Sequence, residues 1–199
     1  MILLNRRVGP GEPPYRISHA GASHNGDLQL GYKLVETAGA AGAEGVVLER
    51  GALAERDFKC VLGHATHVGL TPLGAPANDV DVALLASMDV AGVRFADADA
   101  LPPALLSRAA KTAWSMILSL RSASVDAAVA VFDACRRGGS GPVALLAPDP
   151  RMMEAWRAAL PACPVGLLAL PEDVHIAPGA HLIETTHRLP PALSRRNRS

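Results

Sequence analysis

Eight short apolar runs recur along this chain at a fairly even spacing, and they restrict its fold more than any other feature. Each run has about the length of a β-strand, and most are bounded by Gly or Pro. Their lack of polar alternation is typical of strands that are covered on both faces, as in parallel sheets. The runs are YRISHAGAS from Tyr15, GVVLER from Gly45, HVGLTP from His67, AGVRFAD from Ala91, SMILSL from Ser115, PVALLAP from Pro142, PVGLLAL from Pro164 and HLIETT from His181.

Helical patterns occupy most of the gaps between these runs. The segment from Asp27 to Ala41 carries apolar residues on one side, and Gly42 is placed to end a helix there. Ser124 and Asp149 are each placed to cap a further helix, and residues 79–88 and 101–110 also fit the pattern. A full helix is doubtful in residues 51–66, and none is expected in residues 171–179 or after Thr186.

Alternating strands and helices imply right-handed crossovers and a parallel sheet, and eight strands favour closure into a barrel. We therefore predict a compact (β/α)8 TIM-type barrel with some helices shortened or missing, at the lower length limit of that fold with 199 residues. Residues 1–14 are expected to form an N-terminal extension, 15–190 the barrel and 191–199 a basic C-terminal tail. No GxGxxG or GxxxxGK[ST] motif follows the first run, which argues against dinucleotide-binding and P-loop folds.

The charge balance argues against a nucleic-acid partner, since Lys+Arg and Asp+Glu both number 19. The three cysteines, Cys60, Cys135 and Cys163, share no short spacing, so we expect neither disulfides nor a zinc site. The N-terminal residues do not resemble a secretory signal, and no apolar stretch approaches membrane-spanning length. We expect a cytoplasmic, soluble protein.

The stretch from Ile17 to Glu49 carries the most specific signal. It has the turn Ser23-His24-Asn25-Gly26 after the first run and an Ala-Gly-Ala approach to the second. It resembles the opening of the sialic acid synthase (NeuB) family, whose barrel begins with a strand, an N-H-x-G turn, a helix and A-x-x-V-K-F-Q. Shorter fragments fall in register with the same family: Leu70-Thr71-Pro72, Val93 to Asp97, Ile117-Leu118-Ser119 and Leu182-Ile183-Glu184.

This resemblance implies a chemistry as well as a fold. Members of the family condense phosphoenolpyruvate with an N-acylated mannosamine-type sugar, and they use a divalent metal held partly by two histidines. Lysines hold the phosphate and carboxylate of phosphoenolpyruvate, the metal polarises the sugar aldehyde, and a small antifreeze-like domain from a partner subunit completes the site.

The sequence departs from that template at most of the positions that bind phosphoenolpyruvate or the metal in the family. Val47 stands where the family has a strand-two Lys, Arg94 where it has a strand-four Lys, and Asp97 in place of a nearby Ser. The turn that carries one metal histidine is replaced by residues 165–170, VGLLAL, and the second metal histidine falls on Thr186, with His187 one position late. The sequence does not contain the antifreeze-like domain.

The polar positions that remain are the candidate site. His19, which replaces a family Glu, and Glu184 are the catalytic candidates. The candidates for substrate binding are His24, Asn25, Thr71, Arg94, Ser119 and Arg121. A purely structural role is the alternative interpretation for several of these residues. Asn25-Gly26 makes a good turn, Thr71-Pro72 ends a strand, and Ser119 can satisfy a backbone group. No metal site is predicted, although His19, His24 and His187 could converge into a replacement one.

Two hypotheses follow from these residues. In the first, the chain is a synthase-like barrel of nonulosonic acid or surface-glycan biosynthesis that has lost catalysis and acts as a subunit or regulator. In the second, it is an active phosphoenolpyruvate-dependent condensing enzyme or lyase, with Arg94, Arg121 and His19 in new roles and a divalent metal. The first is preferred on mechanism. Under it we expect a homo-oligomer or a complex with a related full-length synthase, and binding of phosphoenolpyruvate or another small anion.

Overall fold

The computed structural model of the protein describes residues 2–4, 6–112, 114–120, 122, 124–139, 141–169 and 180–186. Eight parallel strands close into a barrel in the order β10-β3-β4-β5-β6-β7-β8-β9, which confirms the predicted barrel. The strands are β3 (Tyr15–Gly21), β4 (Gly45–Leu48), β5 (Thr71–Gly74), β6 (Gly92–Phe95), β7 (Ser115–Ser119), β8 (Val143–Ala147), β9 (Val165–Ala169) and β10 (Leu182–Thr186). Each lies within, or starts inside, one of the eight apolar runs.

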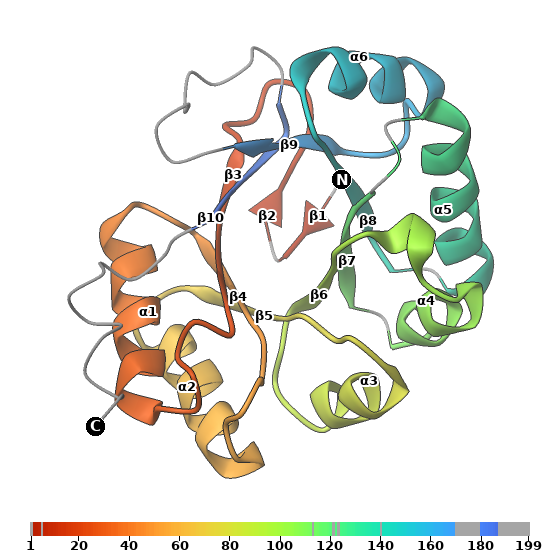
Figure 1. Cartoon of the computed structure of the whole chain (residues 1–199). Helices are drawn as coiled ribbons and strands as arrows, with labels where there is room; N and C mark the ends of the chain where they lie inside the picture. The colour runs from red at the N-terminus through yellow and green to blue at the C-terminus, as the bar shows by residue number, and fades with distance from the viewer. Residues whose placement is uncertain are drawn as a thin grey trace.

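Within the described residues, six α-helices cover the outside of the barrel (Figure 1). They are α1 (Leu28–Ala40), α2 (Glu55–His67), α3 (Asp79–Ala86), α4 (Pro103–Ala110), α5 (Val125–Gly138) and α6 (Pro150–Ala159), and a 3-10 turn, η1 (Ala98–Ala100), precedes α4. Asp27, Ser124 and Asp149 cap their helices as predicted, each accepting a hydrogen bond from a backbone N–H of the first turn. Gly42, just past the end of α1, has φ +76°, the left-handed conformation that suits glycine after a helix.

The doubt about a helix in residues 51–66 was wrong. The helix α2 runs for 13 residues, and it buries Phe58, Val61, Leu62 and Ala65 against the barrel. These four residues follow the i, i+3, i+4, i+7 spacing of one helix face. Polar residues between them make the segment look like a linker in the sequence. The third apolar run therefore begins inside this helix, and its strand starts only at Thr71. The connection predicted to lack a helix, 171–179, and the tail 191–199 lie outside the described residues.

Buried side chains divide into a shell between helices and strands and a smaller group inside the barrel. On β7, Met116 and Leu118 belong to the shell, while Ile117 belongs to the interior. The same alternation on β4 places Val47 in the interior and Val46 and Leu48 in the shell. Side chains two residues beyond the interior positions therefore form the last layer at the carboxyl ends of the strands.

The predicted N-terminal extension closes the opposite end of the barrel. It folds into a hairpin of β1 (Ile2–Leu3) and β2 (Arg6–Arg7), which lies within the ring of strands in Figure 1. Leu3, Leu4 and Val8 are almost fully buried and belong to the interior group. The Leu4 backbone N–H donates to the Ser115 hydroxyl oxygen at 3.0 Å. The hairpin is therefore a structural plug at the amino-terminal end of the barrel.

Among the described helices, none is both long enough and apolar enough to cross a lipid bilayer.

Candidate functional site

Polar side chains gather in the last interior layer, at the carboxyl ends of the strands, where barrel enzymes carry their active sites. His19 lies two residues beyond the interior Ile17, and Glu184 two residues beyond the interior Leu182. Arg94 comes from β6 and Ser119 from the end of β7, and both are buried. The structure thus brings four of the predicted site residues to one end of the barrel.

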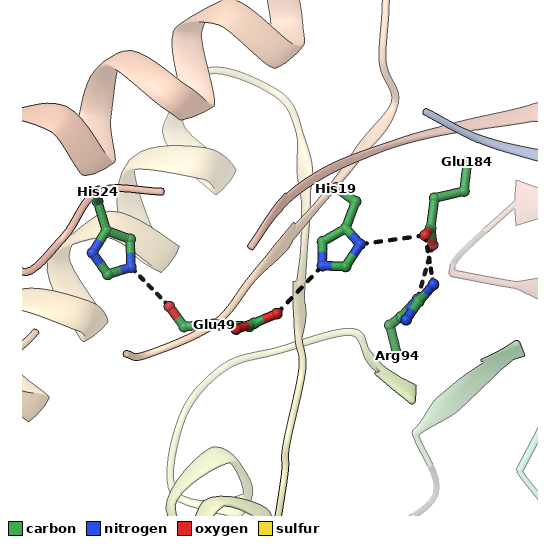
Figure 2. A network of polar contacts seen from close by, with 5 residues as sticks. All are labelled: His19, His24, Glu49, Arg94 and Glu184. Carbon is green, nitrogen blue, oxygen red and sulfur yellow. Dashed lines mark hydrogen bonds and ion pairs between the residues drawn. The ribbon is translucent and has the colours of Figure 1, made fainter. Parts of the chain in front are cut away.

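Arg94 and Glu184 form a buried ion pair at one end of the polar network in this layer (Figure 2). The Arg94 Nη2 donates to Glu184 Oε1 at 2.8 Å, and the Nε donates to Oε2 at 3.1 Å. Their side chains are only 6% and 2% exposed. This is a bidentate, charge-assisted pair, the strongest form of hydrogen bonding that an arginine makes with a carboxylate.

His19 extends the network on the other side of Glu184. Its Nδ1 lies 3.4 Å from Glu184 Oε1, and its Nε2 lies 3.5 Å from Glu49 Oε1. Figure 2 shows the imidazole between the two carboxylates. Burial by itself would lower the pKa of His19, but its contacts with Glu184 and Glu49 outweigh this and raise the pKa to about 9. The imidazole is therefore a cation at neutral pH.

The two carboxylates stay ionised for the complementary reason. Glu49 has a lowered pKa because His19 contacts it, although partial burial opposes the shift. Burial opposes the shift at Glu184 as well, but His19 and Arg94 together lower its pKa. Two cations therefore face two anions, and the network of His19, Glu49, Arg94 and Glu184 is neutral as a whole.

Glu49 was not among the predicted site residues. It follows the last residue of β4 and lies two residues beyond the interior Val47, so strand alternation alone would have placed it in the polar layer. A cavity of about 260 Å³ opens beside it, where the loops after β4 and β5 meet α2 and α3. Glu49, Arg50, Asn78 and Asp81 supply the polar groups on its wall.

His24 is fully buried and acts on the backbone around it. Its Nε2 lies 2.9 Å from the Glu49 carbonyl oxygen, and its Nδ1 accepts the Gly26 backbone N–H at 3.1 Å. Both ring nitrogens are thus engaged in holding the loop after β3 to the end of β4. Asn25 is exposed with φ +49°, so it supplies the turn rather than a wall of the site.

Of the remaining predicted residues, only Thr71 is among those that the structure describes. Thr71 is the first residue of β5 and pairs with Gly45, the first residue of β4, so it lies at the end of the barrel away from the network. Arg121 and His187 fall outside the described residues, as does the side chain of Thr186.

Among the described residues, the donor set at this end of the barrel does not fit a divalent metal held by two histidines. The chain has Val, Gly, Leu and Ala at residues 165–170, and none of these side chains offers a ligand atom. No group of three or more His, Cys, Asp or Glu among the described residues is arranged to hold a metal ion. The two described histidines at this end of the barrel are already engaged: His19 contacts Glu49 and Glu184, and His24 bonds to the backbone.

Comparisons with known proteins place the chain by its fold. No family model matches the sequence. An uncharacterised protein of Methanocaldococcus jannaschii is 28% identical over 134 residues, which cover 58% of this chain and 40% of that protein. This chain therefore aligns with less than half of the curated relative.

Solved structures give a closer match in shape than in sequence. The N-acetylneuraminic acid (sialic acid) synthetase of Leptospira borgpetersenii matches with a TM-score of 0.82 and 17% identity, over 97% of this chain and 79% of that one. The Bacillus subtilis spore coat polysaccharide biosynthesis protein spsE matches with a TM-score of 0.81 and 19% identity, over 94% and 63%. A truncated 3-deoxy-D-arabino-heptulosonate 7-phosphate synthase of Thermotoga maritima matches with 0.72 and 15%, over 94% and 79%. The chain therefore shares its (β/α)8 barrel fold with the sialic acid synthase and spore coat polysaccharide proteins, and with the heptulosonate phosphate synthase.

Proposed function

We propose that this protein is a sialic-acid-synthase-like barrel of glycan biosynthesis that does not catalyse the condensation itself and acts as a subunit or regulator. The resemblance in the first strand and turn, together with the barrel shared with two glycan-biosynthesis proteins, supports the pathway class. The electrostatics of the carboxyl-end layer support the loss of catalysis.

The observation that carries this proposal is the pairing of Arg94 with Glu184. An arginine that is to hold the phosphate or carboxylate of phosphoenolpyruvate must offer its donors to that anion. Here two donors of Arg94 are bonded to a buried carboxylate. The second cation that the structure describes in this layer, His19, lies between two carboxylates. A neutral network attracts an anion far less than the free cations of an anion site would.

Two substitutions point in the same direction. Val47 lies in the barrel interior at 0% exposure, where the resemblance implies a phosphate-binding lysine. The positions implied for metal histidines hold hydrocarbon side chains or Thr186. Each preorganised charge removed from such a site costs about 10²–10³-fold in turnover, so the losses together suppress catalysis by many orders of magnitude.

The test is a condensation assay with phosphoenolpyruvate, N-acetylmannosamine and manganese. We expect no product above the rate without protein. Calorimetry with phosphoenolpyruvate measures whether the carboxyl-end layer binds the anion at all. Product formation that disappears in Arg94→Ala would overturn the proposal and establish the alternative, an active condensing enzyme or lyase.

That alternative has one specific observation in its favour. His19 is a protonated imidazole between two carboxylates. One of these carboxylates, Glu49, lines a cavity. A protonated imidazole of this kind can deliver a proton to a bound substrate. A lyase of this type would lose its activity in His19→Gln, whereas a catalytically silent subunit would show no activity to lose.

A role as subunit or regulator requires a partner, and we propose a second copy of this chain or a related full-length synthase. Light scattering at micromolar concentration is expected to report a dimer or larger species for a homo-oligomer. Co-purification with a full-length synthase encoded in the same genome tests the second partner. A monomer that binds no synthase would contradict this part of the proposal.

A further inference from the structure

The main chain of Glu49 is held on both sides by the segment that follows His19. The Glu49 N–H donates to the Gly21 carbonyl at 3.1 Å, and the Glu49 carbonyl oxygen lies 2.9 Å from Nε2 of His24. Gly21 is the last residue of β3, at the point where the register of β3 against β4 shifts, and His24 lies in the loop that follows. This segment therefore fixes the place at which the Glu49 side chain leaves the end of β4.

The contacts of His24 determine where its proton lies. The Gly26 N–H donates to Nδ1 at 3.1 Å, so Nδ1 carries no proton and Nε2 must carry one. A carbonyl oxygen can only accept, and the Nε2–H of His24 therefore donates to Glu49. The residue is fully buried and both ring nitrogens are engaged, so the ring cannot turn without breaking a hydrogen bond. His24 is thus a rigid link between its own loop and the main chain of Glu49.

The carboxylate of Glu49 has little else to keep it in place. Its side chain is 44% exposed, and the one ion-pair partner that the structure describes for this carboxylate is His19 Nε2, at 3.5 Å. This separation is at the outer limit of a hydrogen bond, so a small shift of the main chain would lose the contact. Glu184, the other carboxylate beside the imidazole, is 2% exposed and is held by two hydrogen bonds from Arg94. Of the two carboxylates, Glu49 is therefore the one whose position depends on its backbone.

From these contacts we propose that His24 is a positioning residue, which acts through the main chain of Glu49 to hold the Glu49 carboxylate against the imidazole of His19. Figure 2 shows this chain of contacts, in which His24 and His19 lie on opposite sides of Glu49. The role concerns the carboxyl-end network that the proposed function describes. It does not depend on whether the protein is catalytically silent, since it needs only the contacts themselves.

The charge of His19 reports on the position of Glu49. Among the described residues, the charged groups that face the imidazole are Glu184 on β10, Glu49 at the end of β4 and Arg94 on β6. Burial lowers the pKa of His19, the two carboxylates outweigh this and raise it to about 9, and Arg94 opposes them. A Glu49 carboxylate that moves away withdraws one of the two charges that favour the imidazolium. The pKa of His19 should therefore fall when His24 no longer holds Glu49.

Two substitutions separate the two hydrogen bonds of His24. His24→Gln places an amide N–H near the position of Nε2, so it can still donate to the Glu49 carbonyl, but it loses the contact with Gly26. His24→Asn is shorter, so its amide oxygen can accept the Gly26 N–H while the side chain does not reach Glu49. We expect His24→Asn to lower the pKa of His19 by about half a unit or more, whereas His24→Gln keeps it close to the wild-type value. An NMR titration of the His19 ring measures both, with the resonance assigned by its loss in His19→Gln.

Glu49→Gln gives the full size of the effect and tests the route. Without a negative charge at this position, the pKa of His19 should fall by about one unit or more. Adding His24→Asn to Glu49→Gln should then cause little further change, because the group through which His24 acts has already gone. Leu4→Ala is the control for lost stability, since it removes buried side-chain atoms from the N-terminal hairpin, at the opposite end of the barrel. It should leave the pKa of His19 unchanged.

Three results would overturn the inference. One is a wild-type pKa of His19 in His24→Asn, and another is an equal fall in Leu4→Ala. The third is an effect of His24→Asn that is the same with and without Glu49→Gln, because His24 would then act independently of Glu49. In the wild-type protein, nitrogen NMR of the His24 ring should place its proton on Nε2, and a proton on Nδ1 would also contradict the inference. The condensation assay and the light-scattering measurement do not enter this test, so the inference and the proposed function can fail separately.

Discussion

Arg94 and Glu184 belong to strands on opposite sides of the barrel, since β6 and β10 are separated by three strands in either direction around the ring. Their side chains nevertheless meet in two hydrogen bonds of 2.8 and 3.1 Å. The ion pair thus spans the interior at its carboxyl end and occupies the space above the apolar layers. In this position it can act as a structural tie across the barrel, in addition to removing a cation from any anion site.

The first prediction concerns the stability of this tie. Arg94→Leu leaves the Glu184 carboxylate with one fewer partner in a buried position, and the loss of one member of a buried pair costs about 3–5 kcal/mol. Urea unfolding at pH 7 measures the free energy directly. The matched control is Asp79→Asn, which breaks the Arg108–Asp79 pair, whose side chains are 59% and 52% exposed, and is expected to change stability by about 1 kcal/mol or less. If both variants lower the free energy of unfolding by the same small amount, the buried pair does not act as a structural tie.

The second prediction is a pH dependence of stability that comes from His19. Its pKa rises from 6.5 to about 9 on folding, so the folded state binds the proton more tightly than the unfolded state does. The resulting stabilisation is fully present below pH 6.5, declines as the pH rises, and is gone above about pH 9, with a size of up to about 3 kcal/mol.

Urea unfolding between pH 6 and pH 10 checks this, as the difference between the wild type and His19→Gln. That difference should shrink across the window. His67→Gln, which changes an exposed histidine at the end of α2, is the control for the substitution itself. A constant gap for His19→Gln would mean that the imidazole does not hold its extra proton.

The third prediction separates a structural from a ligand-binding role for His24. His24→Ala removes two hydrogen bonds to the backbone and leaves a cavity, so it should destabilise the protein by about 2–4 kcal/mol. Asn25→Gly is the neighbouring control. Because Asn25 already has φ +49°, a conformation that glycine adopts freely, this change should cost about 0.5 kcal/mol or less. Thermal unfolding of both variants measures the contrast. A His24→Ala variant of normal stability would return His24 to the list of substrate-binding candidates.

The fourth prediction tests the N-terminal plug. Leu4 is 3% exposed inside the barrel, and Ile2, two residues earlier, is 63% exposed. Leu4→Ala should therefore cost about 2–5 kcal/mol, and Ile2→Ala less than about 0.5 kcal/mol. Chemical denaturation of the two variants distinguishes a plug from a loose extension, since an extension would tolerate both changes equally.

Local pattern accounted for most of the architecture. The eight apolar runs, Gly42 and the capping residues Asp27, Ser124 and Asp149 could be assigned from the sequence because strand burial, helix capping and glycine conformation depend on a few adjacent residues. The helix α2 was not predicted, because its apolar residues Phe58, Val61, Leu62 and Ala65 are interspersed with charged residues. Only the packing against the barrel shows that this apolar face is large enough to hold a helix in place.

The site shows the opposite dependence. The sequence alone identified His19, Arg94 and Glu184 as polar residues at strand ends, and it identified Val47 as a position without charge. It could not tell that Arg94 and Glu184, 90 residues apart, are paired, that Glu49 joins them, or that His24 binds backbone rather than ligand. Those relationships depend on barrel closure, which brings side chains of opposite strands within hydrogen-bonding distance. They also depend on burial, because a buried charge is stable only when it is paired with an opposite charge. Strand number and residue type are local properties, whereas the choice of electrostatic partner is made only when the ring of strands is complete.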